Sequence, residues 1–215
     1  MYKKPNKIIS FSLWGANPKY TVGAVKNAAL AKEIYPGWTC RFYVSKDVPE
    51  DIIAQLKSYD NTEVFVMNEP ADHTAMFWRF YPMCDGLVDV MISRDTDSRL
   101  SAREKAAVDE WLASGLPLHI MRDHSWHVSL MMGGMWGCLP RYFSQAAESL
   151  ASFQRQNAYD TDQRWLREKL FPAASSSAMI HDEIHSGRKF PTPRAGGEYV
   201  GAPFNENDEL EIQFK

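Results

Sequence analysis

The chain has 215 residues, 45% of them hydrophobic and 24% charged, which is the composition of an ordinary globular domain with a substantial core. Its net charge of -3 gives no general electrostatic basis for binding nucleic acid or an anionic membrane. No apolar run reaches 18 residues, so we expect no membrane span. Three widely spaced cysteines favour reduced thiols in the cytoplasm over a disulfide framework.

Strand-like and helix-like segments alternate along the first half of the chain. Apolar runs rich in β-branched and aromatic residues predict strands, and amphipathic segments between them predict helices. The strands are expected at 8–13, 41–44, 63–67 and 87–92, and the helices at 21–34 and 49–59. This alternation is typical of an α/β fold with a mostly parallel, mixed sheet flanked by helices.

The second half is predicted to continue the same domain. A capping-box pattern at Ser101 and Glu104 opens a helix at 102–113, and a strand follows at 118–121. Further helices are expected at 142–156 and from 161, with a last short strand at 178–180. We therefore predict a single domain over 1–215, with an irregular tail from about 186.

Two aspartates, Asp95 and Asp97, directly follow the expected strand at 87–92. Such a strand end is where open α/β sheets bind ligands, and hard cations such as Mn²⁺ or Mg²⁺ prefer carboxylate oxygens. Short D-x-D strings also arise by chance or in turns. The strand before and the helix after favour a metal site, and the adjacent Arg94 suggests that a diphosphate arrives with the metal.

Other residues near predicted strand ends are candidates for binding a nucleotide. Trp14 and Lys19 follow the first strand and offer an aromatic face and a charge, although such residues often only pack or remain solvated. Arg79 lies in the aromatic-rich stretch 76–81, where a guanidinium needs an anionic partner. Either a phosphate or an acidic side chain would serve.

A second polar group follows the strand expected at 118–121. Asp123 and His124 are candidates for acid–base chemistry or for binding the acceptor. His127 could join His124 on a metal, but a structural role is the alternative for either. Gly133 and Gly134 stand among large apolar residues, which indicates close approach of the backbone to a ligand or to another part of the chain.

Four short motifs follow one another along the chain: Asp95/Asp97, Gly133-Gly134, Asp162-Gln163 and His181. Together they resemble the GT-A type, nucleotide-sugar-dependent glycosyltransferases. The same order occurs in glycogenin-like and galactosyltransferase-like families, and the first motif is similar to that of small viral and bacterial transferases. The resemblance implies a single Rossmann-like GT-A domain that takes a sugar from a nucleotide-diphosphate donor, with a UDP-sugar expected.

The resemblance also implies roles for individual residues. Asp95, Asp97 and His181 would hold Mn²⁺ or Mg²⁺, which bridges the donor's diphosphate. Asp162 would lie beside the donor sugar, with Gln163 and the two glycines also lining the donor site. The basic donor-phosphate contact falls on Arg188 or Lys189, and we take Lys189, although the Lys-Pro-Trp of glycogenin-like proteins is missing here.

The acceptor is expected to be a hydroxyl of a glycan or another molecule. An inverting enzyme needs a general base, for which Asp123, His124 or Asp162 could serve, whereas a retaining enzyme would place a carboxylate, such as Asp162, beneath the sugar. Two alternatives stay open. A sugar-phosphate nucleotidyltransferase also uses metal-bound aspartates but normally has a glycine-rich first loop, and a non-catalytic nucleotide-sugar-binding domain would only bind the cation.

Overall fold

β1 (Lys7–Leu13) lies near the middle of a seven-stranded sheet in the residues that this computed structural model describes, 4–185, 187–194, 196 and 198–211. The strand order is β3-β2-β1-β4-β6-β5-β7, and all neighbouring pairs are parallel except the two that include β6. The remaining strands are β2 (Thr39–Ser45), β3 (Thr62–Met67), β4 (Val90–Ser93), β5 (Leu118–Arg122), β6 (Trp136–Cys138) and β7 (Ala178–Asp182).

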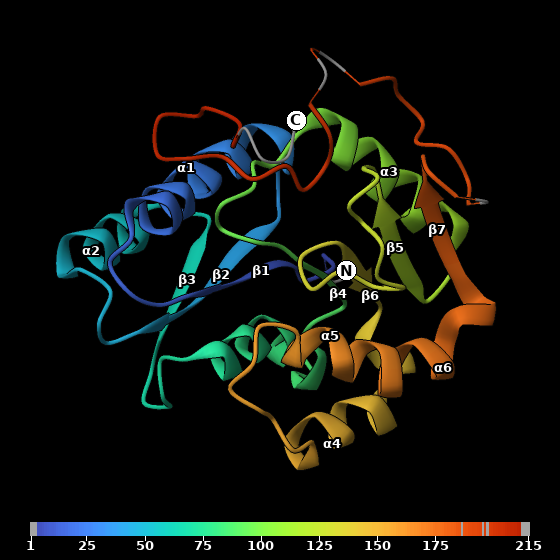
Figure 1. Ribbon diagram of the computed structural model, residues 1–215, viewed down its shortest axis with the longest axis horizontal. Helices are drawn as coiled ribbons and strands as arrows, with labels where there is room; N and C mark the ends of the chain where they lie inside the picture. Colours follow the sequence, from blue (N-terminus) through green and yellow to red (C-terminus); the bar gives the residue numbers. More distant parts are fainter. Residues whose placement is uncertain (1–3, 186, 195, 197, 212–215) are drawn as a thin grey trace.

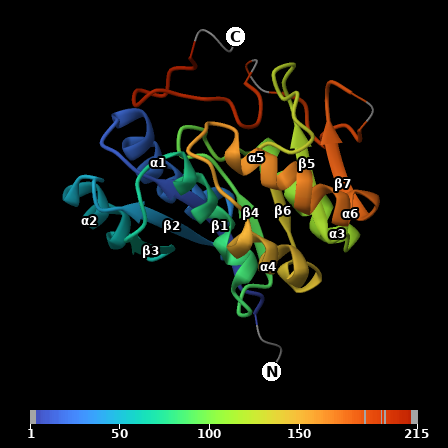
Figure 2. The same ribbon diagram turned by 60° about the horizontal axis from the view of Figure 1, so that its bottom comes forward.

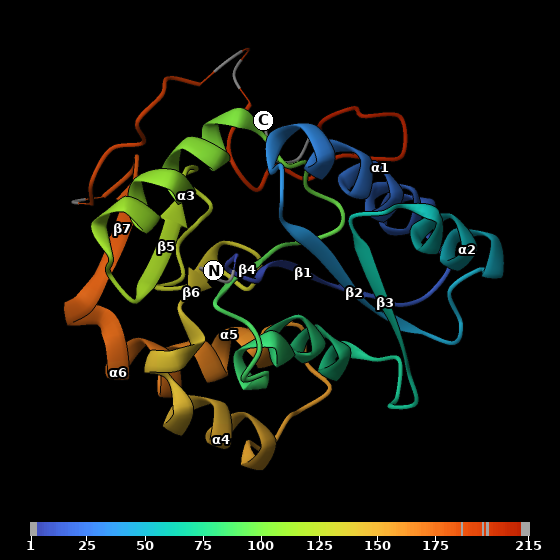
Figure 3. The same cartoon turned by 180° about the vertical axis from the view of Figure 1, so that it is seen from behind.

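Helices cover both faces of the sheet, as Figure 1 and Figure 3 show. One face carries α1 (Pro18–Ile34), α2 (Glu50–Ser58) and α3 (Ala102–Ser114). The other carries the 3₁₀ helix η1 (His73–Cys84) and α4 (Ser144–Ser152), followed by α5 (Thr161–Trp165), the π-helical η3 (Leu166–Leu170) and α6 (Phe171–Ala174). Short 3₁₀ turns are η2 (Pro140–Tyr142) and η4 (Ser175–Ser177). The expected α/β fold with a mostly parallel, mixed sheet is confirmed.

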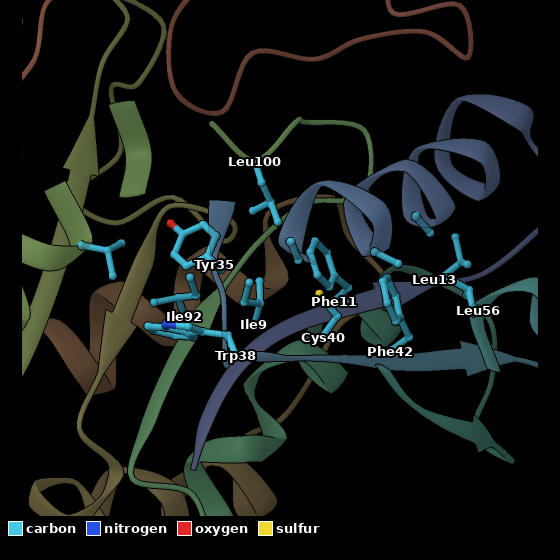
Figure 4. Close-up of a cluster of buried hydrophobic side chains, with 14 of the residues drawn as sticks. Ile9, Phe11, Leu13, Tyr35, Trp38, Cys40, Phe42, Leu56, Ile92 and Leu100 are labelled. Atoms are coloured by element: carbon cyan, nitrogen blue, oxygen red, sulfur yellow. The ribbon is translucent and has the colours of Figure 1, made fainter. Parts of the chain in front are cut away.

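An apolar cluster fills the space between the sheet and α1, α2 and α3 (Figure 4). The rings of Phe11 in β1 and Phe42 in β2 stack with centroids 4.8 Å apart. Ala24, Ala28 and Ala31 are buried on the facing side of α1, and their small side chains let the helix lie close to the sheet. Burial of one large apolar side chain contributes about 1.5–3 kcal/mol, so this cluster fixes α1 firmly beside β1.

A second apolar cluster lies on the opposite face. The ring of Phe80 in η1 is 5.1 Å from Trp136 in β6 and 5.7 Å from Trp165 in α5, measured between centroids. This packing confirms that the aromatic stretch before β4 belongs to the core. It also brings η1, β6 and α5 together beneath the end of β4.

Four local expectations differ from the structure. The helix expected at 142–156 is shorter, because α4 runs from Ser144 to Ser152. The helix expected from 21 begins at Pro18, because Asn17 caps it by accepting a hydrogen bond from Lys19 N at 3.0 Å. The strand expected from 87 begins at Val90, since Leu87 lies in an exposed turn. β6 was not expected at all, because it has three residues with Gly137 in the middle.

The chain after β7 crosses the edge of the sheet where β4 and β5 end (Figure 2). Phe204 N donates to Asp97 O at 2.8 Å, and Val200 N donates to Asp123 Oδ2 at 2.9 Å. We call residues 198–211 the C-terminal strap. They contain turns and isolated bridges rather than a helix or strand. Among the described helices, none is long and apolar enough to cross a membrane.

Candidate active site

The loop that carries Asp95 and Asp97 leaves the carboxyl end of β4 and is held by α1. The side-chain amide of Asn27 donates to Thr96 O at 3.3 Å and to Ser98 O at 2.8 Å. Its Oδ1 accepts a third hydrogen bond, of 3.0 Å, from a backbone N–H further along the loop. Asn27 is buried, so these bonds have little competition from water and fix the loop against the helix.

Arg79 connects Asp95 with Asp162. Its Nη1 forms an ion pair with Asp95 Oδ1, and its Nη2 pairs with Asp162 Oδ2 at 2.6 Å. Burial alone would lower the pKa of Arg79, but the two carboxylates outweigh it and raise that pKa. The sequence left open whether Arg79 pairs with a phosphate or with an acidic side chain. In this structure its partners are the carboxylates of Asp95 and Asp162.

Lys19 connects Asp97 with the C-terminal strap. Its Nζ lies 3.0 Å from Asp97 Oδ2 and 2.9 Å from Glu211 Oε1. Burial, and then the charge of Asp95, raises the pKa of Asp97, while Lys19 opposes that shift. The prediction that the first loop lies near the aspartate pair is confirmed for Lys19.

Gly133 and Gly134 pass directly beside these charged groups. A Cβ at Gly133 would overlap Arg79 Nη2 and Asp162 Oδ2, and a Cβ at Gly134 would overlap the carboxylate of Asp95. Ser93 Oγ donates to Gly133 O at 2.7 Å and ties the segment to the end of β4. The close backbone approach predicted from these glycines is therefore present. The backbone approaches the carboxylates of Asp95 and Asp162 and the guanidinium of Arg79.

Asp162 reaches the same cluster from the first turn of α5. Its side chain is almost fully buried, and burial raises its pKa; Arg79 opposes the shift and Asp95 adds to it. Gln163 N donates to Asp162 Oδ1 at 2.8 Å, so the main chain of Gln163, rather than its side chain, supports the carboxylate. Asp162 thus reaches the loop of Asp95 and Asp97 from a separate segment, through Arg79.

Arg94 requires a correction, because it points into the protein. Its guanidinium is buried, with Nε 2.8 Å from Glu104 Oε1, and Tyr35 also donates to that oxygen at 2.6 Å. Nη1 donates to the carbonyl oxygens of Ser93 and Trp136. Arg94 is only 1% exposed, so it cannot reach a diphosphate at the surface. It instead joins β4, β6 and α3.

Asp123 requires a correction as a general base. Its carboxylate is fully buried and accepts two hydrogen bonds of 2.9 Å from Arg103, besides that of Val200 N. Burial raises the pKa of Asp123, but these donors outweigh it and lower that pKa. His124 is less enclosed, with its ring stacked on Tyr199 at 4.1 Å between centroids. Its role in proton transfer stays a prediction.

His181 and Lys189 are not brought to the aspartate pair. His181 Nδ1 lies 2.8 Å from His119 Nε2, and its Nε2 lies 3.1 Å from Glu110 Oε2, so both ring nitrogens have partners. β7 is three strand positions from β4, about 14 Å across the sheet. Lys189 Nζ donates to Glu183 O at 2.8 Å in the same region. Strand order therefore argues against both expected contacts.

Trp14 packs with Tyr43 and Trp78 in a small apolar cluster at the end of β1 and β2. Packing is therefore the role that the contacts show for it. Its expected stacking against a base stays a prediction.

The aspartate pair suits a divalent cation in charge and ligand type. Four carboxylates (Asp95, Asp97, Asp162 and Glu211) face two cations (Arg79 and Lys19), which leaves an excess of two negative charges when all are ionised. No group of three acidic, His or Cys side chains among the described residues could enclose a metal. Mg²⁺ and Mn²⁺ are commonly held by one or two carboxylates with water and substrate phosphates, and that arrangement fits here.

Two cavities lie beneath the chain after β7 rather than at the aspartate pair. One of about 450 Å³ is lined partly by Arg103, Glu183 and Arg194, and one of about 320 Å³ partly by Arg103 and Tyr199. The second is also lined by the start of α3, immediately after the aspartate loop. Neither of these two cavities is lined by Asp95, Asp97 or Asp162.

Sequence reasoning missed Gly23, Asn27 and Glu211. A Cβ at Gly23 would overlap Thr96 O, so this glycine lets α1 approach the aspartate loop. A glycine and an asparagine four residues apart on the otherwise apolar face of α1 are the signal that could have identified the first two. Glu211 had no local signal, because its contact with Lys19 joins the two ends of the chain.

No protein-family model and no curated protein sequence matches this chain. Solved structures do match its fold. The mannosyltransferase PcManGT from Pyrobaculum calidifontis, in complex with GDP-Man and Mn²⁺, has a TM-score of 0.57 at 8% identity, covering 85% of this chain and 56% of its own. The chain has a GT-A-like fold.

Two further structures share this fold. Glucosyl-3-phosphoglycerate synthase from Mycobacterium tuberculosis has a TM-score of 0.51 at 12% identity, covering 87% of this chain and 73% of its own. The 4-diphosphocytidyl-2C-methyl-D-erythritol synthase from Anaerococcus prevotii has a TM-score of 0.53 at 12% identity, covering 86% of this chain and 91% of its own. At these identities the likeness concerns the fold alone.

Proposed function

We propose that this chain is a metal-dependent glycosyltransferase that moves a sugar from a nucleotide-diphosphate donor, expected to be a UDP-sugar, to a hydroxyl of a glycan or another acceptor. The observation that carries the proposal is the meeting of Asp95, Asp97 and Asp162 at the end of β4. Complexes of two proteins with this fold support it, one with GDP-Man and Mn²⁺ and one with Mn²⁺, UDP-glucose and phosphoglyceric acid. Free thiols at all three cysteines fit the cytoplasm that we propose for it.

Each residue of the cluster has a distinct task in this proposal. Asp95 and Asp97 would hold Mn²⁺ or Mg²⁺, which acts as a Lewis acid on the departing diphosphate. Lys19 offers Nζ to a diphosphate oxygen in place of Glu211, and this preorganised charge stabilises the negative charge that develops there. Asp162, held by Arg79 and the main chain of Gln163, faces the donor sugar. His124 remains the candidate base for the acceptor hydroxyl.

Calorimetric titration of UDP and GDP, with and without Mn²⁺, tests the proposal. We expect one nucleotide to bind in a metal-dependent way and Asp97→Ala to weaken that binding at least about tenfold, or about 1.4 kcal/mol. Asp60→Ala is the matched control, because Asp60 is an exposed aspartate just before β3, at the opposite end of the strands. Binding that ignores both Mn²⁺ and Asp97→Ala would remove the aspartate pair from the site.

A sugar-phosphate nucleotidyltransferase is the second candidate. The name of the Anaerococcus prevotii synthase denotes the synthesis of a diphosphocytidyl compound, and this chain covers 91% of its length. The first loop argues against it, since residues 14–19 contain one glycine. The two reactions release different products. Release of a nucleoside diphosphate from a sugar nucleotide indicates the glycosyltransferase. Release of pyrophosphate from a nucleoside triphosphate and a sugar phosphate indicates the nucleotidyltransferase. A binding domain without activity would bind the sugar nucleotide and release neither.

A further inference from the structure

Arg79 lies between two carboxylates that the proposed function assigns to different tasks. Its Nη1 pairs with Asp95, a proposed metal ligand, and its Nη2 pairs with Asp162, the proposed donor-sugar carboxylate, at 2.6 Å. We propose that Arg79 competes with the divalent cation for Asp95 and so lowers the affinity of the site for the metal. This inference rests on the proposed function of the site.

The two ion pairs of Arg79 differ in their exposure to water. The side chain of Asp95 is 43% exposed, whereas that of Asp162 is 1% exposed. A pair with an exposed partner is screened by water and contributes little, but breaking a buried pair leaves an uncompensated charge inside the protein. When a cation binds, the bond to Asp95 is therefore the one that is released, and the bond to Asp162 is retained.

The surroundings of Arg79 hold it in place during this exchange. Its backbone N–H donates to Ser12 Oγ at 2.9 Å, and the Gly133 backbone closes over Nη2. The Nε–H is buried and has no acceptor in the described part of the chain, so the guanidinium is held through Nη1 and Nη2. A fixed Arg79 is consequently a fixed positive charge beside the metal ligands.

Arg79 and the backbone of Gly134 both lie against the carboxylate of Asp95. Oδ1 is paired with Arg79, and Oδ2 lies against the backbone of Gly134. A cation that binds Asp95 competes with the guanidinium for the negative charge of this carboxylate, whereas Asp97 is paired through Oδ2 with Lys19. Arg79 is thus a positioning residue that lowers metal affinity until the donor's diphosphate adds its own negative charge.

The charge-conserving double variant Arg79→Gln/Asp162→Asn tests this inference. It removes one positive and one negative charge, so an effect of net charge alone predicts unchanged Mn²⁺ affinity. Competition predicts that Mn²⁺, titrated without nucleotide and followed by the loss of its free EPR signal, binds about tenfold more tightly than to the wild type. Unchanged or weaker binding by the folded double variant overturns the inference.

Two further variants make the outcome specific. Adding Asp95→Ala to the double variant is expected to abolish the gain, and a gain that survives overturns competition through Asp95. Arg79→Met/Asp162→Asn makes the same charge change with an apolar side chain, and serves if the first double variant does not fold by circular dichroism. Failure of the proposed function is distinct from these results, because the wild type would then bind neither Mn²⁺ nor nucleotide in a way that depends on Asp97.

Discussion

Gly23 in α1 lies so close to the backbone carbonyl oxygen of Thr96 that a Cβ at position 23 would overlap that oxygen. In an exposed helix, Gly→Ala would stabilise the protein by about 0.5–1 kcal/mol. Here we expect Gly23→Ala to lower the free energy of unfolding by about 1–3 kcal/mol, because the helix and the aspartate loop must move apart. Urea denaturation measures the stability, and calorimetry should show weaker Mn²⁺-dependent binding of UDP.

Gly86→Ala is the control for this prediction. A Cβ at Gly86 would meet no atom within 4 Å, so the substitution adds the same methyl group without a clash. Stability of Gly23→Ala equal to that of the wild type would show that α1 can accommodate the methyl group, and would contradict the close-approach argument.

The buried pair of Arg94 and Glu104 is expected to stabilise the fold without contacting a ligand. Arg94→Met should lower the free energy of unfolding by about 3–5 kcal/mol, since it leaves the Glu104 carboxylate buried beside Tyr35 without its cation. Adding Glu104→Gln should restore part of that loss. Chemical denaturation measures both effects.

The exposed pair of Lys105 and Asp109 on the same helix provides the comparison for Arg94. Lys105→Met should cost at most about 1 kcal/mol. If the folded double variant Arg94→Met/Glu104→Gln lost metal-dependent nucleotide binding, the conclusion that Arg94 lies outside the donor site would be wrong.

His127 is expected to make the protein less stable in acid. Burial, with a smaller contribution from His124, lowers the pKa of His127 to about 4, against about 6.5 in an unfolded chain. As the pH falls below 6.5 the unfolded state takes up the proton first, so stability is lost between pH 6.5 and 4. The loss from this group is about 3 kcal/mol.

His127→Asn isolates that contribution. The Asn Oδ1 can replace Nδ1 as the acceptor for Asp123 N, which donates to His127 at 3.0 Å. Urea denaturation at a series of pH values should give a flatter profile for this variant than for the wild type, while the exposed His185→Asn keeps the wild-type profile. Equal slopes for the wild type and His127→Asn would refute the assignment.

Glu211 is expected to oppose binding of an anionic ligand at Lys19. Glu211→Gln should raise the affinity for UDP about threefold at saturating Mn²⁺, or about 0.7 kcal/mol, because it removes a negative charge 2.9 Å from Lys19 Nζ. Glu209→Gln changes an exposed carboxylate in the same strap that bonds to Asn205 instead. Calorimetry that gives the same gain for both variants would indicate a general charge effect and exclude a specific contact.

β1 and β2 were predictable because they are almost wholly buried and rich in β-branched and aromatic residues. β6 was not, since three residues with an internal glycine carry no periodic pattern. Their positions after predicted strands were enough to suggest that Asp95, Asp97 and Lys19 belong to a ligand site. Position after a strand was misleading for His181, because sequence does not reveal that β7 lies at the edge of the sheet beyond β5.

The partners of Arg79 show a second limit of sequence reasoning. The sequence did predict that Arg79 needs an anionic partner, because its guanidinium lies among aromatic residues. The identity of that anion depended on Asp95 and Asp162, which lie 16 and 83 residues further along the chain. Pairings over such separations follow from the packing of η1 against β4 and α5, which no local pattern encodes.

Among the described strands, β6 alone joins the block β3-β2-β1-β4 to the pair β5-β7. Loss of its pairing would divide the sheet in two and separate Asp95 from the segment of Gly134, which immediately precedes β6. A ligand that binds across these two segments must therefore raise the free energy of local opening. Slower hydrogen exchange at the amides of Trp136–Cys138 would report occupancy of the site from inside the core of the protein.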